Sequence, residues 1–145
     1  LEADLQFGLG LLAATERVSV REIVEARELL EAPACALAAL RRTDEQVAEL
    51  RELVDHEDHE LFHLAILDMS GNELVGALTR PLYGALRHRV RREDAPAAFW
   101  QRVAEAHLRI LAAIEAGDPE AAEREMRDHL RTLTPFYEKL DRRVG

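Results

Sequence analysis

Residues 19–41, SVREIVEARELLEAPACALAALR, decide the fold class of this chain. Ser19 and Glu22 stand at the spacing of a capping box, in which both side chains satisfy free backbone N–H groups at a helix start. Apolar residues then follow at helical spacing, and Pro33 inside the pattern predicts a kink or a local distortion. The stretch therefore predicts one long helix.

The composition extends this prediction to the whole chain. Its 145 residues suit one domain, and no linker rich in Pro, Gly or Ser divides them. Hydrophobic residues make up 48% and aromatic residues 5%, so the core must be built mainly of aliphatic side chains. Ala, Leu, Glu and Arg dominate the sequence, and all four favour helices. We expect a single all-α domain over residues 1–145.

Helix start and stop signals recur along the rest of the chain. They are the capping pair Thr43 and Gln46, the polar break 55–58, the stop at Ser70-Gly71-Asn72, Gly117, and the start at Asp118-Pro119. Besides the helix opened by Ser19, the expected helices cover 5–14, 43–54, 59–69, 73–92 with an interruption at Pro81, 97–116 and 119–142. Six or seven helices with short connections predict an antiparallel bundle.

Charge and cysteine content indicate which partners and which cellular compartment suit the domain. A net charge of −9 disfavours direct binding of nucleic acid, because that requires a basic face. The apolar run 5–14 is too short to span a membrane, and it lacks the basic start of a signal peptide. One cysteine, Cys35, fits a cytoplasmic protein and predicts a small buried side chain. Because the chain begins at Leu1, we expect a fragment of a longer protein.

Four of the six histidines stand on apolar helix faces. His59 and His63 lie one helical turn apart on the same face. His107 and His129 each fall within an apolar stripe of a different helix. Three separate helices are therefore expected to direct imidazole rings toward the core.

Two interpretations of these histidines remain open at this point. A single histidine on an apolar face is most often a hydrogen-bonded core residue. Four of them on three helices can instead surround a divalent ion, and neutral imidazole suits Zn, Ni, Cu and Fe. A shared metal would also remove the free-energy cost of burying imidazoles without partners. His56 and His88 have polar neighbours and are expected in solvent.

Two arginines also interrupt apolar stripes. Arg27 either pairs with Glu31 one turn away, or places its guanidinium in a core cavity to bind a carboxylate through two parallel hydrogen bonds. Arg89 continues the apolar stripe of the helix expected over 73–92. Neighbouring arginines also indicate that the end of this helix is generally basic. Arg27 and Arg89 are the candidate ligand-binding residues.

Several short motifs occur in a specific order. They are Glu25-Ala26-Arg27-Glu28-Leu29-Leu30-Glu31, Phe62-His63, Ser70-Gly71-Asn72, Glu105-Ala106-His107, Ile114-Glu115-Ala116-Gly117-Asp118 and Met126-Arg127-Asp128-His129-Leu130. With them the chain resembles the FCD domain, the C-terminal effector domain of FadR-type regulators in the GntR family. The resemblance covers about Val20 to Arg142 and implies the same all-α bundle.

The resemblance also implies a metal site. Metal-binding members of that family use one aspartate and three histidines, and the three histidines correspond by position to His63, His107 and His129. The aspartate position, four residues before His63, holds His59 here. Either His59 replaces the carboxylate or Asp58 reaches in from one position earlier, and helix phase favours His59. A site of nitrogen ligands alone favours Zn, Ni or Cu over Mn.

The function implied by the resemblance is ligand sensing and dimerisation. A small organic acid would coordinate the metal through its carboxylate, with Arg27 as a further contact. The family forms homodimers and reads DNA through an N-terminal winged helix, which we expect to be absent from this chain. The alternatives are a metal-free effector-binding module and a metal-dependent hydrolase. We do not expect an enzyme, since Glu60 and Glu105 lie off the apolar faces and no other carboxylate pair or nucleophile stands beside the histidines.

Overall fold

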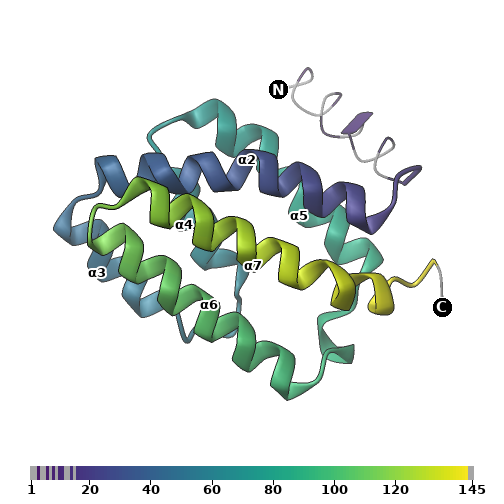
Figure 1. Cartoon of the computed structure of the whole chain (residues 1–145). Helices are drawn as coiled ribbons and strands as arrows, with labels where there is room; N and C mark the ends of the chain where they lie inside the picture. Colours follow the sequence, from purple (N-terminus) through teal and green to yellow (C-terminus); the bar gives the residue numbers. More distant parts are fainter. Residues whose placement is uncertain are drawn as a thin grey trace.

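The computed structural model describes residues 16–143, together with positions 3, 6, 8, 10, 11 and 14. Half of the short helix expected over 5–14 lies outside these described residues, and positions 6, 8, 10, 11 and 14 are helical. Within the described part the chain folds into six α-helices and one short 3-10 turn, as Figure 1 shows. The helices are α2 (Val20–Arg41), α3 (Asp44–Leu53), α4 (Glu60–Met69), α5 (Glu73–Arg89), α6 (Ala97–Glu115) and α7 (Pro119–Leu140), with the turn at Arg92–Asp94. The predicted all-α class is confirmed.

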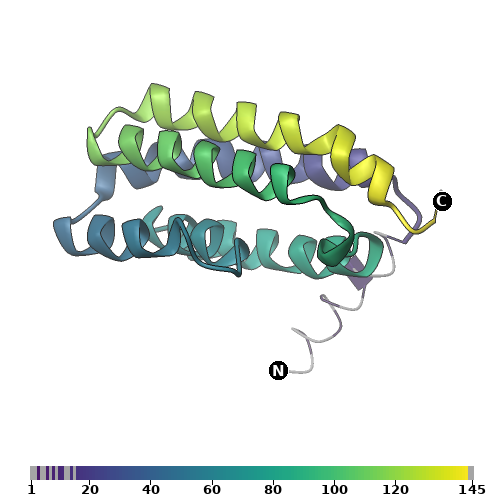
Figure 2. The same cartoon turned by 90° about the horizontal axis from the view of Figure 1, so that it is seen from below.

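The helices stack in two layers around an aliphatic core. Figure 2 shows α2, α6 and α7 on one side and α3, α4 and α5 on the other. The long helix α2 packs along α7 and also contacts α4, α5 and α6, so it reaches both layers. Residues on α2 are therefore placed to contact side chains from both halves of the bundle.

The helix ends follow the local signals in the sequence. Ser19 and Thr43 each form a complete capping box, with side chain and backbone bonds in both directions. Asn72 and Asp118 accept hydrogen bonds from the first turns of α5 and α7. Gly117 follows the C-terminal end of α6 and has a φ of 68°, a left-handed conformation that glycine adopts without steric penalty.

Three prolines, Pro33, Pro81 and Pro135, lie inside described helices that continue through them. The helix α2 continues past Pro33 without a break. The expected interruption at Pro81 is wrong, because α5 continues through it and ends at Arg89. A proline removes one backbone hydrogen bond. Leu82, Ala85 and Leu86, which follow Pro81 in α5, are buried, and their packing holds this helix together.

The core is built as the composition predicts. Its largest fully buried side chains are aliphatic apart from Phe62, Phe99, His107 and Glu31. Cys35 is fully buried in this core, as expected. None of the described helices is both long and apolar enough to cross a membrane. The polar residues in the core are therefore exceptions that require partners.

Candidate metal centre

Three buried imidazoles meet inside the bundle. His63 comes from α4, His107 from α6 and His129 from α7. Each offers one ring nitrogen, and these three nitrogens lie within 4.8 Å of one another. All three residues are at most 4% exposed. The structure thus brings together three of the four histidines that the sequence places on apolar faces.

The distances suit a shared cation. The Nε2 atoms of His63 and His107 lie 3.2 Å apart. Two imidazole nitrogens bound to one ion at about 2.1 Å are separated by roughly 3.0–3.4 Å in octahedral or tetrahedral geometry. Nδ1 of His107 and Nε2 of His129 are buried and have no hydrogen-bond partner among the described residues. A divalent metal bound by the group would give Nε2 of His129 the partner that the described residues do not supply.

Burial keeps these imidazoles neutral. Loss of hydration lowers the pKa of His63, His107 and His129 below the usual histidine value, and for His107 and His129 the neighbouring imidazoles lower it further. Glu31 opposes the shift at His63 without reversing it. Neutral imidazole has the lone pair that a transition metal needs, so the group is ready to bind at neutral pH.

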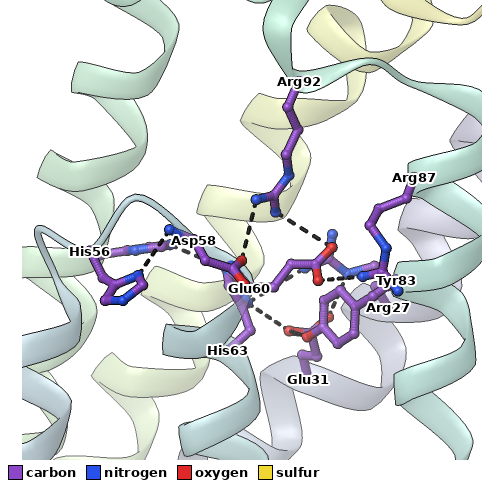
Figure 3. Close-up of polar contacts among 10 residues, drawn as sticks. Arg27, Glu31, His56, Asp58, Glu60, His63, Tyr83, Arg87 and Arg92 are labelled. Atoms are coloured by element: carbon purple, nitrogen blue, oxygen red, sulfur yellow. Dashed lines mark hydrogen bonds and ion pairs between the residues drawn. The ribbon is translucent and has the colours of Figure 1, made fainter.

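A buried carboxylate lies behind His63. Glu31 on α2 is 1% exposed, and its Oε1 lies 2.7 Å from Nδ1 of His63. The Tyr83 hydroxyl donates to the same oxygen over 2.7 Å, and Nε of Arg27 donates to Oε2 over 2.7 Å. Figure 3 shows these side chains converging on Glu31. The four residues form one polar cluster within an otherwise apolar interior.

Ionisation of this cluster is set by its charge pairs. Burial alone would raise the pKa of Glu31, but the charge of Arg27 and the hydrogen bonds from His63 and Arg27 outweigh it and hold the value well below the ordinary one. Burial likewise opposes the charge on Arg27, and the Glu31 carboxylate outweighs it and raises the arginine pKa. Burial and the nearby carboxylate raise the pKa of Tyr83, which stays protonated. Glu31 is therefore an anion that can only accept hydrogen bonds.

A small cavity of about 40 Å³ adjoins the histidines, with Arg27, His63, Tyr83 and His129 among its lining residues. This space admits roughly three water molecules. Arg27 pairs with Glu31, as one of its two interpretations expects, and it also lines the cavity. Binding of a ligand carboxylate by Arg27 stays a prediction.

Charged and aromatic side chains also line the cavity, further along its wall. Glu60 forms ion pairs with both Arg87 and Arg92, as Figure 3 shows. The side chain of Glu60 is 14% exposed, and it lines the cavity. Glu60 thus stands off the buried face of α4, as expected, and still lies beside the site. Glu60 is the first residue of α4 and pairs with Arg87 of α5, a neighbour that the pattern of α4 alone does not reveal.

His59 lies beside the three-histidine group and outside it. Its ring stacks on Trp100 with centroids 4.7 Å apart, and it lies 6.0 Å from the centroid of His107. His59 lines the cavity, and its buried Nδ1 has no hydrogen-bond partner among the described residues. The carboxylate of Asp58 instead contacts Arg92 and the N–H of Glu60, so the geometry favours His59 over Asp58.

Arg89 lies away from this cavity. Its guanidinium donates to both carboxylate oxygens of Asp141 over 3.1 and 2.8 Å, and to the carbonyl oxygen of Val18 over 2.8 Å. Beside it, the backbone of Val90 and Asp141 forms an isolated bridge. The structure thus gives Arg89 a role in joining the end of α5 to the end of α7, and it is absent from the cavity lining. His56 and His88 are exposed, as expected.

Sequence reasoning missed two residues of the site as functional candidates. Tyr83 belongs to the buried face of α5, and Trp100 lies near the start of α6, and neither position carries a sequence signal that links it to the histidines. Glu31 had a signal, its spacing of four residues from Arg27, but that spacing says nothing of its contact with His63.

Comparisons with known proteins agree with this architecture. A family model described as the FCD domain matches residues 22–132. The HTH-type transcriptional regulator LutR of Bacillus subtilis (strain 168) is 31% identical over 132 residues, which cover 79% of this chain and 60% of LutR. This chain therefore spans less than two thirds of the length of that relative.

Two solved structures share the fold. The structure described as E. coli McbR/YncC matches with a TM-score of 0.72 and 25% identity, covering 85% of this chain and 71% of its own. The structure described as Streptococcus agalactiae GntR matches with a TM-score of 0.65 and 24% identity, covering 79% and 57%. The family match spans most of this chain, and the helical architecture agrees with it. This chain belongs to the FCD domain family.

Proposed function

We propose that this domain senses a small organic acid through a divalent metal held by His63, His107 and His129, as the effector-binding part of a GntR-family transcription regulator. One observation carries the proposal. Three buried, neutral imidazoles from three helices offer nitrogens within 4.8 Å of one another. Nε2 of His129 is buried and has no hydrogen-bond partner among the described residues, which weighs against a purely structural, metal-free cluster.

The protein's own groups would divide the work at this site. The three histidines hold the cation through ring nitrogens, and nitrogen ligands alone favour Zn, Ni or Cu. The bound metal would supply positive charge for a carboxylate oxygen of the ligand. Arg27 lines the same cavity and offers a guanidinium, although its Nε is already bonded to Glu31. His59 lines the cavity as well and is the proposed fourth ligand or a neighbour of the organic acid.

The volume of the cavity sets the size of the ligand. About 40 Å³ is far below the several hundred Å³ of a pocket for a drug-sized molecule. An acid with a short carbon chain therefore fits this arrangement. Ligands with few heavy atoms are the ones to screen first.

Regulation would act through two states of a larger protein. LutR is an HTH-type transcriptional regulator, and this chain matches 60% of its length. We propose that this domain forms a homodimer and that a winged-helix domain outside this chain contacts DNA. A net charge of −9 agrees with a domain that does not itself bind nucleic acid. The ligand can alter DNA binding only by binding one arrangement of the dimer more tightly than the other.

Metal content is the first test. Elemental analysis is performed on the chain purified without a His tag and without added metal, and on the variants His63→Ala and His107→Ala. We expect near-stoichiometric Zn or Ni in the native chain and its loss in both variants. The exposed His88 provides the matched control, and His88→Ala is expected to retain the metal. A native chain that takes up neither Zn nor Ni after direct addition refutes the proposal.

A further inference from the structure

We propose that Glu31 is the positioning residue of the metal centre: it holds the proton of His63 on Nδ1 and so directs the lone pair of Nε2 toward His107 and His129. This inference rests on the proposed function, since it assigns the residue that prepares one ligand for the metal. Glu31 does not itself belong to the three-histidine group. It acts through His63.

The direction of the hydrogen bond follows from the chemistry of the carboxylate. Oε1 of Glu31 lies 2.7 Å from Nδ1 of His63, a short distance typical of a charge-assisted bond. An ionised carboxylate has no proton to give, so Nδ1 is the donor over this distance. A guanidinium nitrogen of Arg27 also lies 3.5 Å from Nδ1, too far to compete with the 2.7 Å contact. A neutral imidazole carries only one N–H, and Nε2 is then the atom with the free lone pair. That Nε2 lies 3.2 Å from Nε2 of His107, on the side where the imidazoles meet.

The carboxylate is fixed in turn by two other side chains. Nε of Arg27 donates to Oε2 over 2.7 Å, and the Tyr83 hydroxyl donates to Oε1 over 2.7 Å. These contacts come from α2 and α5, whereas His63 stands on α4. Figure 3 shows the carboxylate of Glu31 among Arg27, Tyr83 and His63. Glu31 is 1% exposed, so water does not compete for its oxygens.

The other two histidines lack such an orienting group. Nδ1 of His107 and Nε2 of His129 are buried and have no hydrogen-bond partner in the described part of the chain. His63 is therefore the ring whose orientation and tautomer are set before the metal binds. Removal of a carboxylate that hydrogen-bonds a metal-binding histidine changes the metal affinity by about 10- to 100-fold.

The first arm of the test reads the tautomer directly, in the metal-free chain. Ring nitrogen-15 chemical shifts of His63, recorded by long-range proton–nitrogen NMR, distinguish a protonated from an unprotonated Nδ1. We expect the proton on Nδ1 in the native chain. A proton on Nε2 overturns the proposal, whatever the metal content turns out to be.

The variant Glu31→Gln reverses the expected tautomer. Arg27 can only donate, so the introduced amide should turn its oxygen to Arg27 and its NH₂ toward Nδ1 of His63. Nδ1 then becomes an acceptor, and the proton moves to Nε2. Zinc affinity, measured by competition with a chromophoric chelator, is expected to fall 10- to 100-fold. An unchanged tautomer together with unchanged zinc affinity overturns the proposal.

Asp141 supplies the matched control. Its buried carboxylate pairs with Arg89 over 2.8 Å, and it contacts none of the three histidines. Asp141→Asn therefore removes a comparable buried ion pair at a distance from the metal centre. We expect this variant to lose stability while it retains the native zinc affinity and the Nδ1 proton of His63. An equal loss of zinc affinity in both variants would mean that Glu31 acts only through general stability, which contradicts a positioning role.

A second variant guards against loss of folding. Glu31→Gln leaves the buried Arg27 without its counter-charge, which is strongly destabilising. The double variant Arg27→Met/Glu31→Leu replaces both charges with apolar side chains of similar size, a change that is often tolerated. It is expected to fold, to lose the preference for the Nδ1 proton and to bind zinc more weakly by the same factor. Native zinc affinity in the folded double variant overturns the inference. A native chain with no zinc affinity refutes the metal site instead, and the tautomer then still decides the role of Glu31.

Discussion

The Nε2 atoms of His63 and His107 lie 3.2 Å apart in the interior of the bundle, although the two residues belong to different helices and lie 44 positions apart in the chain. Two neutral imidazoles at that distance form at most one hydrogen bond, because each has a single N–H. The third ring, His129, lies with its centroid 5.3 Å from that of His63. The contact thus marks the point where a cation would join all three helices, and several consequences can be measured.

Zinc should stabilise the folded chain. A ligand that binds only the folded state adds about 2.7 kcal/mol to the free energy of unfolding at a hundredfold excess over its Kd. We therefore expect Zn²⁺ to raise the melting temperature of the native chain and of His88→Ala. Addition of Zn²⁺ should leave the melting temperature of His129→Ala unchanged, because this variant has lost one of the three metal ligands. Calorimetry with and without a chelator checks this, and an equal rise in His129→Ala would contradict it.

The loss of zinc affinity in His59→Ala distinguishes a metal ligand from a residue that only lies beside the metal. If its ring stays stacked on Trp100, as in this structure, His59→Ala should lower zinc affinity less than tenfold. His107→Ala serves as the comparison, since its ring belongs to the three-histidine group and its loss should abolish tight binding. Competition with a chromophoric chelator measures both variants. Equal losses in the two variants would establish His59 as a fourth ligand, as the sequence predicts.

The two candidate arginines should differ in their effect on ligand binding. Arg27 lines the cavity, whereas Arg89 pairs with Asp141 away from it. Arg27→Lys keeps the charge but loses the planar fork that binds a carboxylate, so it should weaken the stabilisation of the zinc-loaded chain by acetate or a similar short acid. Arg89→Lys should leave that stabilisation within twofold of native. A thermal-shift titration checks both, and a larger loss in Arg89→Lys would reverse the assignment.

Stability should depend on pH through Asp141. Hydrogen bonds from Arg89 lower the pKa of Asp141 below its usual value of 3.8. The folded chain therefore keeps this carboxylate ionised at pH values where the unfolded chain already binds a proton. The stabilisation is fully present above about pH 5 and is lost as the pH falls below the unfolded value toward the folded one.

Asp141→Asn isolates this contribution. Removal of one partner of a buried ion pair lowers the free energy of unfolding by roughly 3 kcal/mol at pH 7. Urea unfolding of the native chain and the variant between pH 7 and pH 3 should show a difference that shrinks below pH 4. A difference that stays constant across that range would show that the carboxylate acts by shape and not by charge.

The boundaries of most helices could be predicted from the sequence because they depend on local chemistry. The capping boxes at Ser19 and Thr43 and the left-handed Gly117 involve neighbours within a few residues. Where a local signal for a helix end conflicted with tertiary packing, the packing determined the structure. Pro81 removes a hydrogen bond from α5, yet the buried residues around it keep the helix continuous.

For the candidate site as well, some features follow from the local sequence and others depend on tertiary packing. Helical periodicity determined that His63, His107 and His129 face the core, since that depends only on each helix and its own apolar stripe. It could not determine that their nitrogens lie within 4.8 Å of one another, because the rotation and the sliding of one helix against another are set by packing across the bundle. The same packing gives His63 its carboxylate partner Glu31 and joins Arg89 to Asp141, so only the tertiary structure decided which polar residues form the site.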